Sequence, residues 1–132
     1  MNEYVISCNL DKFDLITHFQ KNKTVIWKQT KPHVIGDLVY IYVGRPYSRL
    51  FYKCIITQID ITQCPEESIF YKNGSGRSRN PKYMELALDK VLPEKKELTL
   101  VELQKNGLKT VQCTTRVLDE LHSYLKCVIM EE

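Results

Sequence analysis

Aromatic, amide and basic side chains gather in the first 50 residues, and these residue types suit the recognition of a nucleobase. Aromatic rings stack on base faces, amides hydrogen-bond to base edges, and lysine and arginine pair with phosphates. Trp27, the only tryptophan, is followed directly by Lys28 and Gln29. The rest of the set comprises Asn9, Tyr40, Tyr42, Tyr47, Arg45 and Arg49. This set favours binding of an unstacked base with its phosphates; packing in the core is the alternative for the tryptophan and each tyrosine.

Signatures of catalysis are absent from the sequence. The three histidines, His18, His33 and His122, are far apart, and no GxSxG, P-loop or HExxH pattern occurs. The deaminase pattern of H-x-E followed by P-C-x-x-C is also missing. We therefore predict a binding module with no catalytic residue, cofactor or metal. The alternative from another class is a small hydrolase or nuclease that uses Lys28 or His33 as an acid-base group in the same cleft.

The length and composition are those of one ordinary soluble domain. The 132 residues are 43% hydrophobic and 27% charged, which is sufficient for a single core. No apolar run reaches the ~18 residues of a membrane span, and residues 1–10 lack the features of a signal peptide, so we expect a cytoplasmic protein without a membrane partner. The cysteines form no C-x-x-C pair and predict buried free thiols, with neither disulfides nor a zinc site. They are Cys8, Cys54, Cys64, Cys113 and Cys127.

Positive charge is concentrated in the first two thirds of the chain, although the net charge is only +3. Residues 21–53 carry seven basic side chains against one acid, and residues 72–82 carry four against none. This distribution favours an anionic partner on one face, whereas scattered solvating lysines are the alternative. Residues 73–81 are rich in glycine and serine, and we interpret them as a basic flap in which Arg77 and Arg79 contact phosphates.

Two strongly patterned segments form the expected centre of the domain. Residues 37–43, DLVYIYV, are apolar on both alternating faces and therefore predict a central strand. Residues 51–61 predict a second such strand, antiparallel to the first. The connecting loop carries Arg45, Tyr47 and Arg49, and loops held by two strands often carry function.

Shorter elements are expected around these two strands. Alternation predicts strands at residues 4–9, 24–28 and 69–71. Residues 83–92 fit either a strand or a helix, and we favour a strand that closes the sheet.

Helical periodicity appears in three places. A helix is predicted from Asp11, with Asn9 or Asp11 as N-cap and Asn22 as its end. Residues 99–105 predict a short helix that begins with a capping box of Thr99 and Glu102. A last helix is expected after Thr114 or Thr115, followed by a possible strand at residues 128–130. Its predicted core face comprises Val117, Leu118, Leu121, Tyr124 and Leu125.

One segment, residues 27–46, carries a family resemblance. Its sequence, WKQTKPHVIGDLVYIYVGRP, resembles the W-x-x-(K/R), V-x-x-GD-x-V-(Y/F)-x-Y-x-G pattern of EVE domains, in the PUA-like superfamily that also contains YTH and ASCH domains. The opening strand and helix and the late sequence LTLVELQKNGLKTVQCTTRVLDELHSYL agree with the order of elements in that family. The resemblance implies a single α+β domain over residues 1–132, a PUA-like mixed β-barrel or sheet flanked by short helices.

The resemblance also implies a pocket for a modified or flipped base, most simply a modified cytosine in DNA. Trp27 would stack on the base, Asn9 and Gln29 would read its edge, and Tyr42 would line the pocket. By position, the base-binding pocket comprises Asn9, Trp27, Gln29, Tyr42, Gly44 and Gln112. The expected phosphate contacts are Lys28, Arg45, Arg49, Arg77, Arg79 and Arg116. Leu10 departs from the family, which commonly has proline after the asparagine.

Two other binding functions fit the same residues. The chain could instead be an ASCH-like RNA-binding domain, which would have the same fold and charge distribution as an EVE domain. A pure interaction protein would use the basic face to meet an acidic protein, with no nucleic acid involved.

Overall fold

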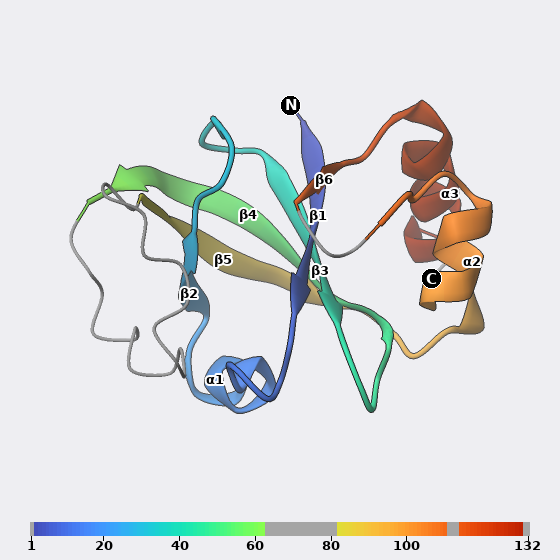
Figure 1. Ribbon diagram of the computed structural model, residues 1–132, viewed down its shortest axis with the longest axis horizontal. Helices are drawn as coiled ribbons and strands as arrows, with labels where there is room; N and C mark the ends of the chain where they lie inside the picture. The colour runs from blue at the N-terminus through green and yellow to red at the C-terminus, as the bar shows by residue number, and fades with distance from the viewer. Residues whose placement is uncertain (1, 63–81, 111–113, 131–132) are drawn as a thin grey trace.

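The chain folds around one mixed sheet (Figure 1). The computed structural model describes residues 2–62, 82–110 and 114–130 of the chain. The strand order is β2-β5-β4-β3-β1-β6. Neighbouring strands are antiparallel, except for the parallel pair β1 and β3. The strands are β1 Glu3–Cys8, β2 Thr24–Lys28, β3 Leu38–Val43, β4 Arg49–Ile61, β5 Tyr83–Val91 and β6 Thr115–Arg116.

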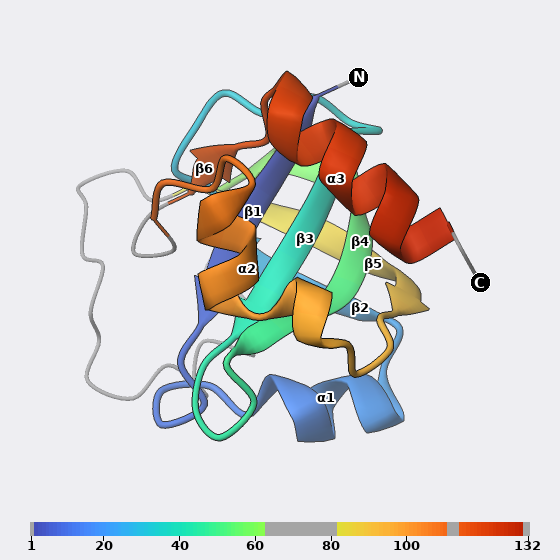
Figure 2. The same ribbon diagram turned by 90° about the vertical axis from the view of Figure 1, so that its right-hand side faces the viewer.

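Helices cover both faces of this sheet. They are α1 Leu15–Lys21, the 3-10 helix η3 Lys96–Leu98, α2 Leu100–Lys105 and α3 Asp119–Met130. Figure 2 shows α2 and α3 in front of β1 and β3, whereas α1 lies at the lower end of the molecule. Within the described part of the chain, no helix combines the length and apolar content that crossing a membrane requires.

The expected centre of the sheet is confirmed. β3 and β4 occupy the two middle positions and pair antiparallel, with Val39 opposite Cys54. Because successive side chains of a strand point to opposite faces, β3 contributes to two cores. Val39, Ile41 and Val43 pack on the α1 side, and Tyr40 and Tyr42 pack under α2 and α3. The alternation of apolar residues on both faces therefore placed this strand correctly.

The sheet is not closed into a barrel. β2 and β6 stand at its two ends in the strand order, and among the described residues they do not pair with each other. The segment 83–92 forms β5 as expected, but β5 lies between β2 and β4 and does not close the sheet. The α+β class and its flanking short helices are as predicted, and the barrel is replaced by an open sheet.

The entry to β3 is held by the Gly36-Asp37 turn. Gly36 has a φ of +99°, a left-handed conformation that side-chain-bearing residues rarely adopt. The buried Asp37 carboxylate accepts hydrogen bonds from the backbone N–H groups of Asn2, at 3.0 Å, and Val34, at 3.2 Å. This turn therefore ties the start of β3 to the chain preceding β1.

The first helix begins later than predicted. α1 starts at Leu15, and Asp14 is its N-cap because its Oδ1 accepts a hydrogen bond from the Thr17 N–H at 3.1 Å. Asn9 instead closes a turn, in which its Oδ1 accepts from the Asp11 N–H at 2.9 Å. The predicted end at Asn22 is confirmed.

The end of the chain differs most from expectation. Residues 115–116 form β6, because their backbone pairs with β1 at Tyr4 and Val5, and α3 begins only at Asp119. Leu118 is 60% exposed and does not belong to the core. Residues 128–130 continue α3 and are not a strand, since Val128 and Ile129 extend its apolar face.

The predicted capping box does not form, whereas the predicted burial of the cysteines is confirmed for two of them. Thr99 is the N-cap of α2 by position, but its hydroxyl donates to the Lys96 carbonyl at 2.7 Å, so the capping box does not form. Cys8 and Cys54 are buried free thiols as expected, and burial raises the pKa of each to about 12, which keeps them protonated. Cys127 is exposed, contrary to expectation, and Cys64 and Cys113 lie outside the described residues.

Candidate functional site

A cavity of about 330 Å³ opens where β1 and β3 end. The two strands are parallel with Cys8 beside Val43, so their carboxyl ends emerge at the same edge of the sheet. The Gly44 N–H donates to the Cys8 carbonyl at 3.1 Å and joins the two exits. The lining residues are Ser7, Cys8, Asn9, Asp11, Tyr42, Gly44 and Arg45.

Asn9 presents an amide to this cavity. Its side-chain Oδ1 is engaged by the Asp11 N–H, and its backbone carbonyl accepts from the N–H groups of Lys12 and Phe13. These bonds fix the turn that follows β1. The Nδ2 group has no hydrogen-bond partner among the residues described, so it can donate to a ligand.

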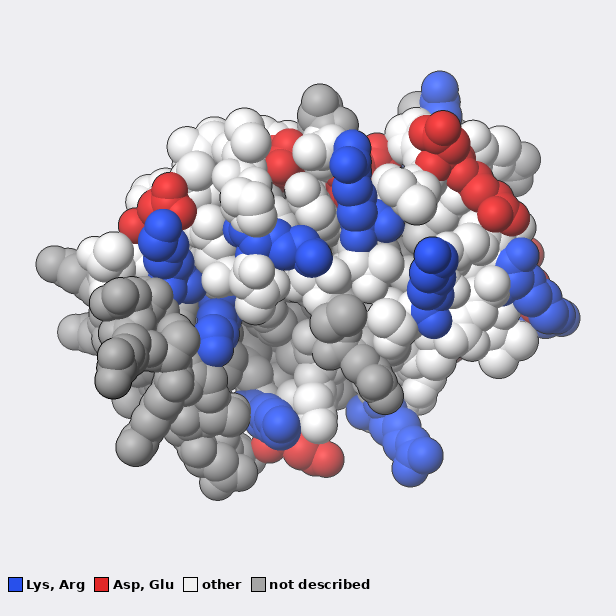
Figure 3. All heavy atoms as spheres, turned by 45° about the horizontal axis from the view of Figure 1, so that its top comes forward, with Lys and Arg blue, Asp and Glu red and all other residues white. Residues whose placement is uncertain are grey.

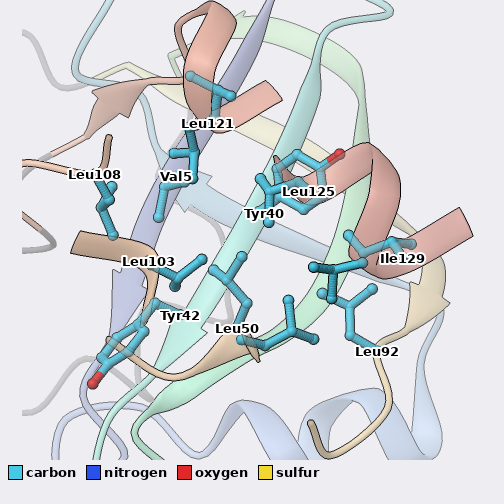
Figure 4. Packing of buried hydrophobic residues seen from close by; sticks show 13 residues of the cluster. Val5, Tyr40, Tyr42, Leu50, Leu92, Leu103, Leu108, Leu121, Leu125 and Ile129 are labelled. Atoms are coloured by element: carbon cyan, nitrogen blue, oxygen red, sulfur yellow. The ribbon is translucent and has the colours of Figure 1, made fainter. Parts of the chain in front are cut away.

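Tyr42 combines a buried ring with an accessible hydroxyl. The side chain is 7% exposed and its ring belongs to the core under α2 and α3. Figure 4 shows the Tyr42 hydroxyl directed away from the other labelled side chains of that core. The hydroxyl makes no hydrogen bond within the described segments, and Tyr42 lines the cavity. It can therefore donate to or accept from a bound group.

Arg45 supplies the positive charge of the cavity. It is exposed, on a tight loop in which the Gly44 carbonyl accepts from the N–H groups of Tyr47, at 3.0 Å, and Ser48, at 3.2 Å. No ion pair joins its guanidinium to another described residue. Asp11 adds a carboxylate acceptor to the wall. The lining residues thus include side chains that bear an amide, a hydroxyl, a carboxylate and a guanidinium.

Trp27 does not join Tyr42 in one pocket. It lies on β2, half-buried, with its ring 5.8 Å from that of Phe13, and it packs against the core on the α1 face. Tyr42 belongs to the core on the opposite face. The core-packing alternative thus describes Trp27, and its neighbour Lys28 on β2 lies outside the lining of this cavity as well.

Gln29 lies at a second cavity, of about 400 Å³. It is lined by Gln29, Thr30, Lys31, Pro32, His33, Asp60 and Lys82. Both ends of the Gln29 amide are used within the protein: Nε2 donates to Asp60 Oδ1 at 3.1 Å, and Oε1 accepts from the Asp60 N–H at 2.9 Å. Asp60, which has a φ of 56°, also pairs with Lys82 at 3.7 Å. Gln29 therefore ties the segment after β2 to the end of β4, and it lies outside the cavity that Asn9 lines.

His33 is the buried histidine of this second cavity. It is 3% exposed, its ring makes an edge contact with Tyr4 at 4.4 Å, and neither ring nitrogen has a hydrogen-bond partner in the described structure. Burial lowers the pKa of His33 below the ordinary 6.5, with opposing effects of Asp37 and Lys31. The folded protein therefore holds this imidazole neutral.

Acidification should destabilise the protein through His33. The unfolded chain gains a proton on this side chain near pH 6.5 and the folded chain does so only at lower pH, so the free energy of unfolding falls as the pH drops below about 6.5. Urea denaturation at pH 7.5 and 5.5 measures the loss. The H33F variant keeps a ring against Tyr4 and should lose less stability over this range; equal losses would contradict the prediction.

Arg49, a predicted phosphate contact, is not among the residues that line the cavity, and its guanidinium binds within the fold. It is 8% exposed, and its Nη1 donates to the carbonyls of Leu50, Leu92 and Pro93 at 3.1 to 3.2 Å. Its guanidinium also lies 4.2 Å from the centre of the Phe51 ring. The Arg49 guanidinium is therefore engaged in contacts that stabilise the fold, and the proposed binding site does not include it.

Arg116 borders a third cavity, of about 240 Å³, with Asn2, Glu3, Val117, Asp119 and His122. It donates to Asn2 Oδ1 at 2.9 Å, and Glu3 Oε2 lies 2.9 Å from His122 Nδ1. Arg116 pairs with Tyr4 near the start of β1, whereas the first cavity lies at the end of that strand. The structure thus separates Arg116 from Asn9 and Tyr42.

The remaining predicted site residues, Gln112, Arg77 and Arg79, lie outside the described residues. Figure 3 shows Lys and Arg side chains across the middle of one face, with Asp and Glu mostly nearer its margins. Among the residues described, no cluster of three or more histidine, cysteine or acidic side chains is arranged to hold a metal ion. Sequence analysis missed Ser7, Cys8 and Asp11 as lining residues, because only the parallel pairing of β1 and β3 brings them beside Tyr42.

Comparison with solved structures identifies the fold. An ASCH protein from Zymomonas mobilis has a TM-score of 0.62 at 14% identity over 96% of this chain and 94% of its own. A Rhodopseudomonas palustris protein solved by NMR has a TM-score of 0.65 at 11% identity over 100% and 96%, and an Agrobacterium tumefaciens protein has 0.58 at 12% over 98% and 92%. No protein-family model matches the chain, and no curated protein matches it.

These likenesses define the class of fold, which is PUA-like and of the ASCH form. The PUA-like fold predicted from the sequence is confirmed. The likeness is to an ASCH fold, and it does not single out the EVE family.

Proposed function

We propose that this chain is a nucleic-acid-binding domain that holds one unstacked nucleotide in the cavity at the ends of β1 and β3. One observation carries the proposal: Asn9, Tyr42 and Arg45, whose side chains bear an amide, a hydroxyl and a guanidinium, line the same cavity. An amide and a hydroxyl match the donor and acceptor pattern of a base edge, and a guanidinium matches a phosphate.

The size and walls of the cavity support a ligand of nucleoside size. Its volume of about 330 Å³ lies at the lower end of the ~300 to 1,000 Å³ of small-molecule sites. Tyr42 and Cys8 supply apolar surface beside the polar groups, and Asp11 can accept from an exocyclic amino group. In this arrangement Asn9 and Tyr42 read the base, and Arg45 holds its phosphate.

Two ligands agree with this site. The EVE-like segment at residues 27–46 favours a modified cytosine in DNA, and the ASCH form of the fold favours RNA about equally. Lys28, Arg77, Arg79 and Arg116 are further candidates for phosphate contacts along the strand. A nucleic-acid partner, either RNA or DNA with a modified base, is thus the common element of the proposal.

Binding should weaken when the cavity side chains are removed. N9A and Y42F each delete one hydrogen-bonding group, so we expect affinity to fall about three- to tenfold. R45A should weaken binding and lower the slope of log affinity against log salt by about one. Fluorescence anisotropy measures this with labelled RNA and DNA decamers that carry one plain, methylated or hydroxymethylated cytosine.

Two variants serve as controls in this experiment. Lys126 is an exposed cation on α3, so K126A should leave the affinity within twofold of the wild type. Trp27 packs against Phe13 outside the cavity, so W27F should also leave it unchanged, whereas the stacking role inferred from the sequence predicts a loss. Absence of binding to every probe would remove the proposed function.

A further inference from the structure

Tyr47 is an exposed aromatic residue beside the candidate cavity. It is 41% exposed, and among the described residues it is the one Phe, Trp or Tyr in the exposed class. The tyrosines at positions 4, 40, 42 and 52 are at most 7% exposed. A tyrosine ring with one face in water is available for a contact outside the chain, since tyrosine combines an apolar ring with a polar hydroxyl.

A stack of side chains holds the Tyr47 ring in place. Its ring meets Phe51 edge-on at 5.0 Å and 84°, and Phe51 contacts Tyr52 at 4.7 Å. Arg49 lies 4.2 Å from the Phe51 ring centre and is itself fixed by three carbonyls. The Tyr47 N–H donates to the Gly44 carbonyl at 3.0 Å. The exposed ring is therefore preorganised and loses little conformational freedom when a ligand binds.

The ring lies close to the cavity. Arg45 lines the cavity, and Tyr47 follows two residues later, so their Cα atoms are at most about 7.6 Å apart. Tyr47 is not itself a lining residue, but its N–H donates to the carbonyl of Gly44, which lines the cavity.

We propose that the exposed face of Tyr47 is a stacking platform for a second base, that of the nucleotide adjoining the one in the cavity. This inference rests on the proposed function and extends it from one nucleotide to a dinucleotide unit of a single strand. Arg45 lies between the two base positions, where the phosphate that links the nucleotides passes. Stacking on an aromatic ring accepts any base, so the platform adds affinity and the cavity adds selectivity.

If Tyr47 is a stacking platform, its removal should weaken the binding of an oligonucleotide but not of a mononucleotide. The probes are cytidine monophosphate and a tetranucleotide of cytidines, each in ribo and deoxyribo form, titrated calorimetrically against the whole chain. Y47A should bind the tetranucleotide about tenfold more weakly than the wild type and bind the monophosphate within twofold of it. Y47F keeps the stacking ring and should bind both as the wild type does.

Each outcome decides between the two proposals. The platform is wrong if Y47A binds the tetranucleotide as tightly as the wild type, or if its affinity falls equally for both probes. In either case, weaker binding by N9A and Y42F would still support the cavity as the binding site. If the wild type binds neither these probes nor the decamers that carry a modified cytosine, the proposed function fails and the platform fails with it. Thermal melting of Y47A and Y47F checks that both variants fold, and Y47F tests the platform without removing the contact to Phe51.

Discussion

Replacement of Arg49 by alanine should lower the free energy of unfolding by about 3 kcal/mol. The buried guanidinium donates to three carbonyls, of Leu50, Leu92 and Pro93, and lies against the Phe51 ring. Hydrogen bonds from a charged group contribute ~1.5 to 3 kcal/mol, and a buried carbonyl left without its donor costs ~1 to 3 kcal/mol. Urea or guanidinium denaturation followed by circular dichroism measures the change.

The matched control is Arg45, four residues earlier, on the loop that precedes β4. R45A removes the same side chain from an exposed position, so its unfolding free energy should stay within ~0.5 kcal/mol of the wild type. R49K keeps the charge but not the planar fork, and it should recover only part of the stability. Equal stability of R49A and R45A would show that Arg49 is not a structural residue.

Replacement of Leu125 by alanine should cost about 2 to 5 kcal/mol. The side chain is 0% exposed and belongs to the core that joins α2 and α3 to the sheet, where Figure 4 places it beside Tyr40. Truncation of a buried leucine removes transfer free energy and leaves a cavity. Chemical denaturation gives the loss directly, and the midpoint of thermal melting should fall with it.

Leu118 is the control for this prediction. The helical pattern of the sequence assigns it to the same core face as Leu125, but in the structure it is 60% exposed and precedes α3. L118A should therefore change the unfolding free energy by less than ~0.5 kcal/mol. If L118A were as destabilising as L125A, the helical register of the C-terminal segment would have to be the one read from the sequence.

The candidate site was only partly accessible from the sequence. Asn9, Tyr42, Gly44 and Arg45 were chosen from residue types and from family resemblance, and the structure gathers all four at one cavity. Trp27, the strongest signal in the sequence, proved to pack on the opposite face of the sheet. Residue type indicates what a side chain can do, but it does not say on which face of a sheet the side chain lies.

Arg49 illustrates the same limit for charge. In the sequence it is one more cation of a basic segment, equivalent to Arg45. Its partners Leu92 and Pro93 lie 43 and 44 positions later, and they reach it only because β4 and β5 pair. A contact between such distant positions leaves no periodic signal near the arginine.

What the sequence determined by itself is therefore local. Alternation predicted the two central strands and β2, and the helical period predicted α1, α2 and α3 in the described residues, although α1 and α3 begin later than expected. Burial on one or two faces imposes a repeat of two or 3.6 residues on neighbouring positions. The tertiary structure decided the open sheet, the pairing of β6 with β1, and the meeting of β1 and β3 at one edge. Those features depend on which distant strands pair, and pairing is a property of the whole chain that no local repeat encodes.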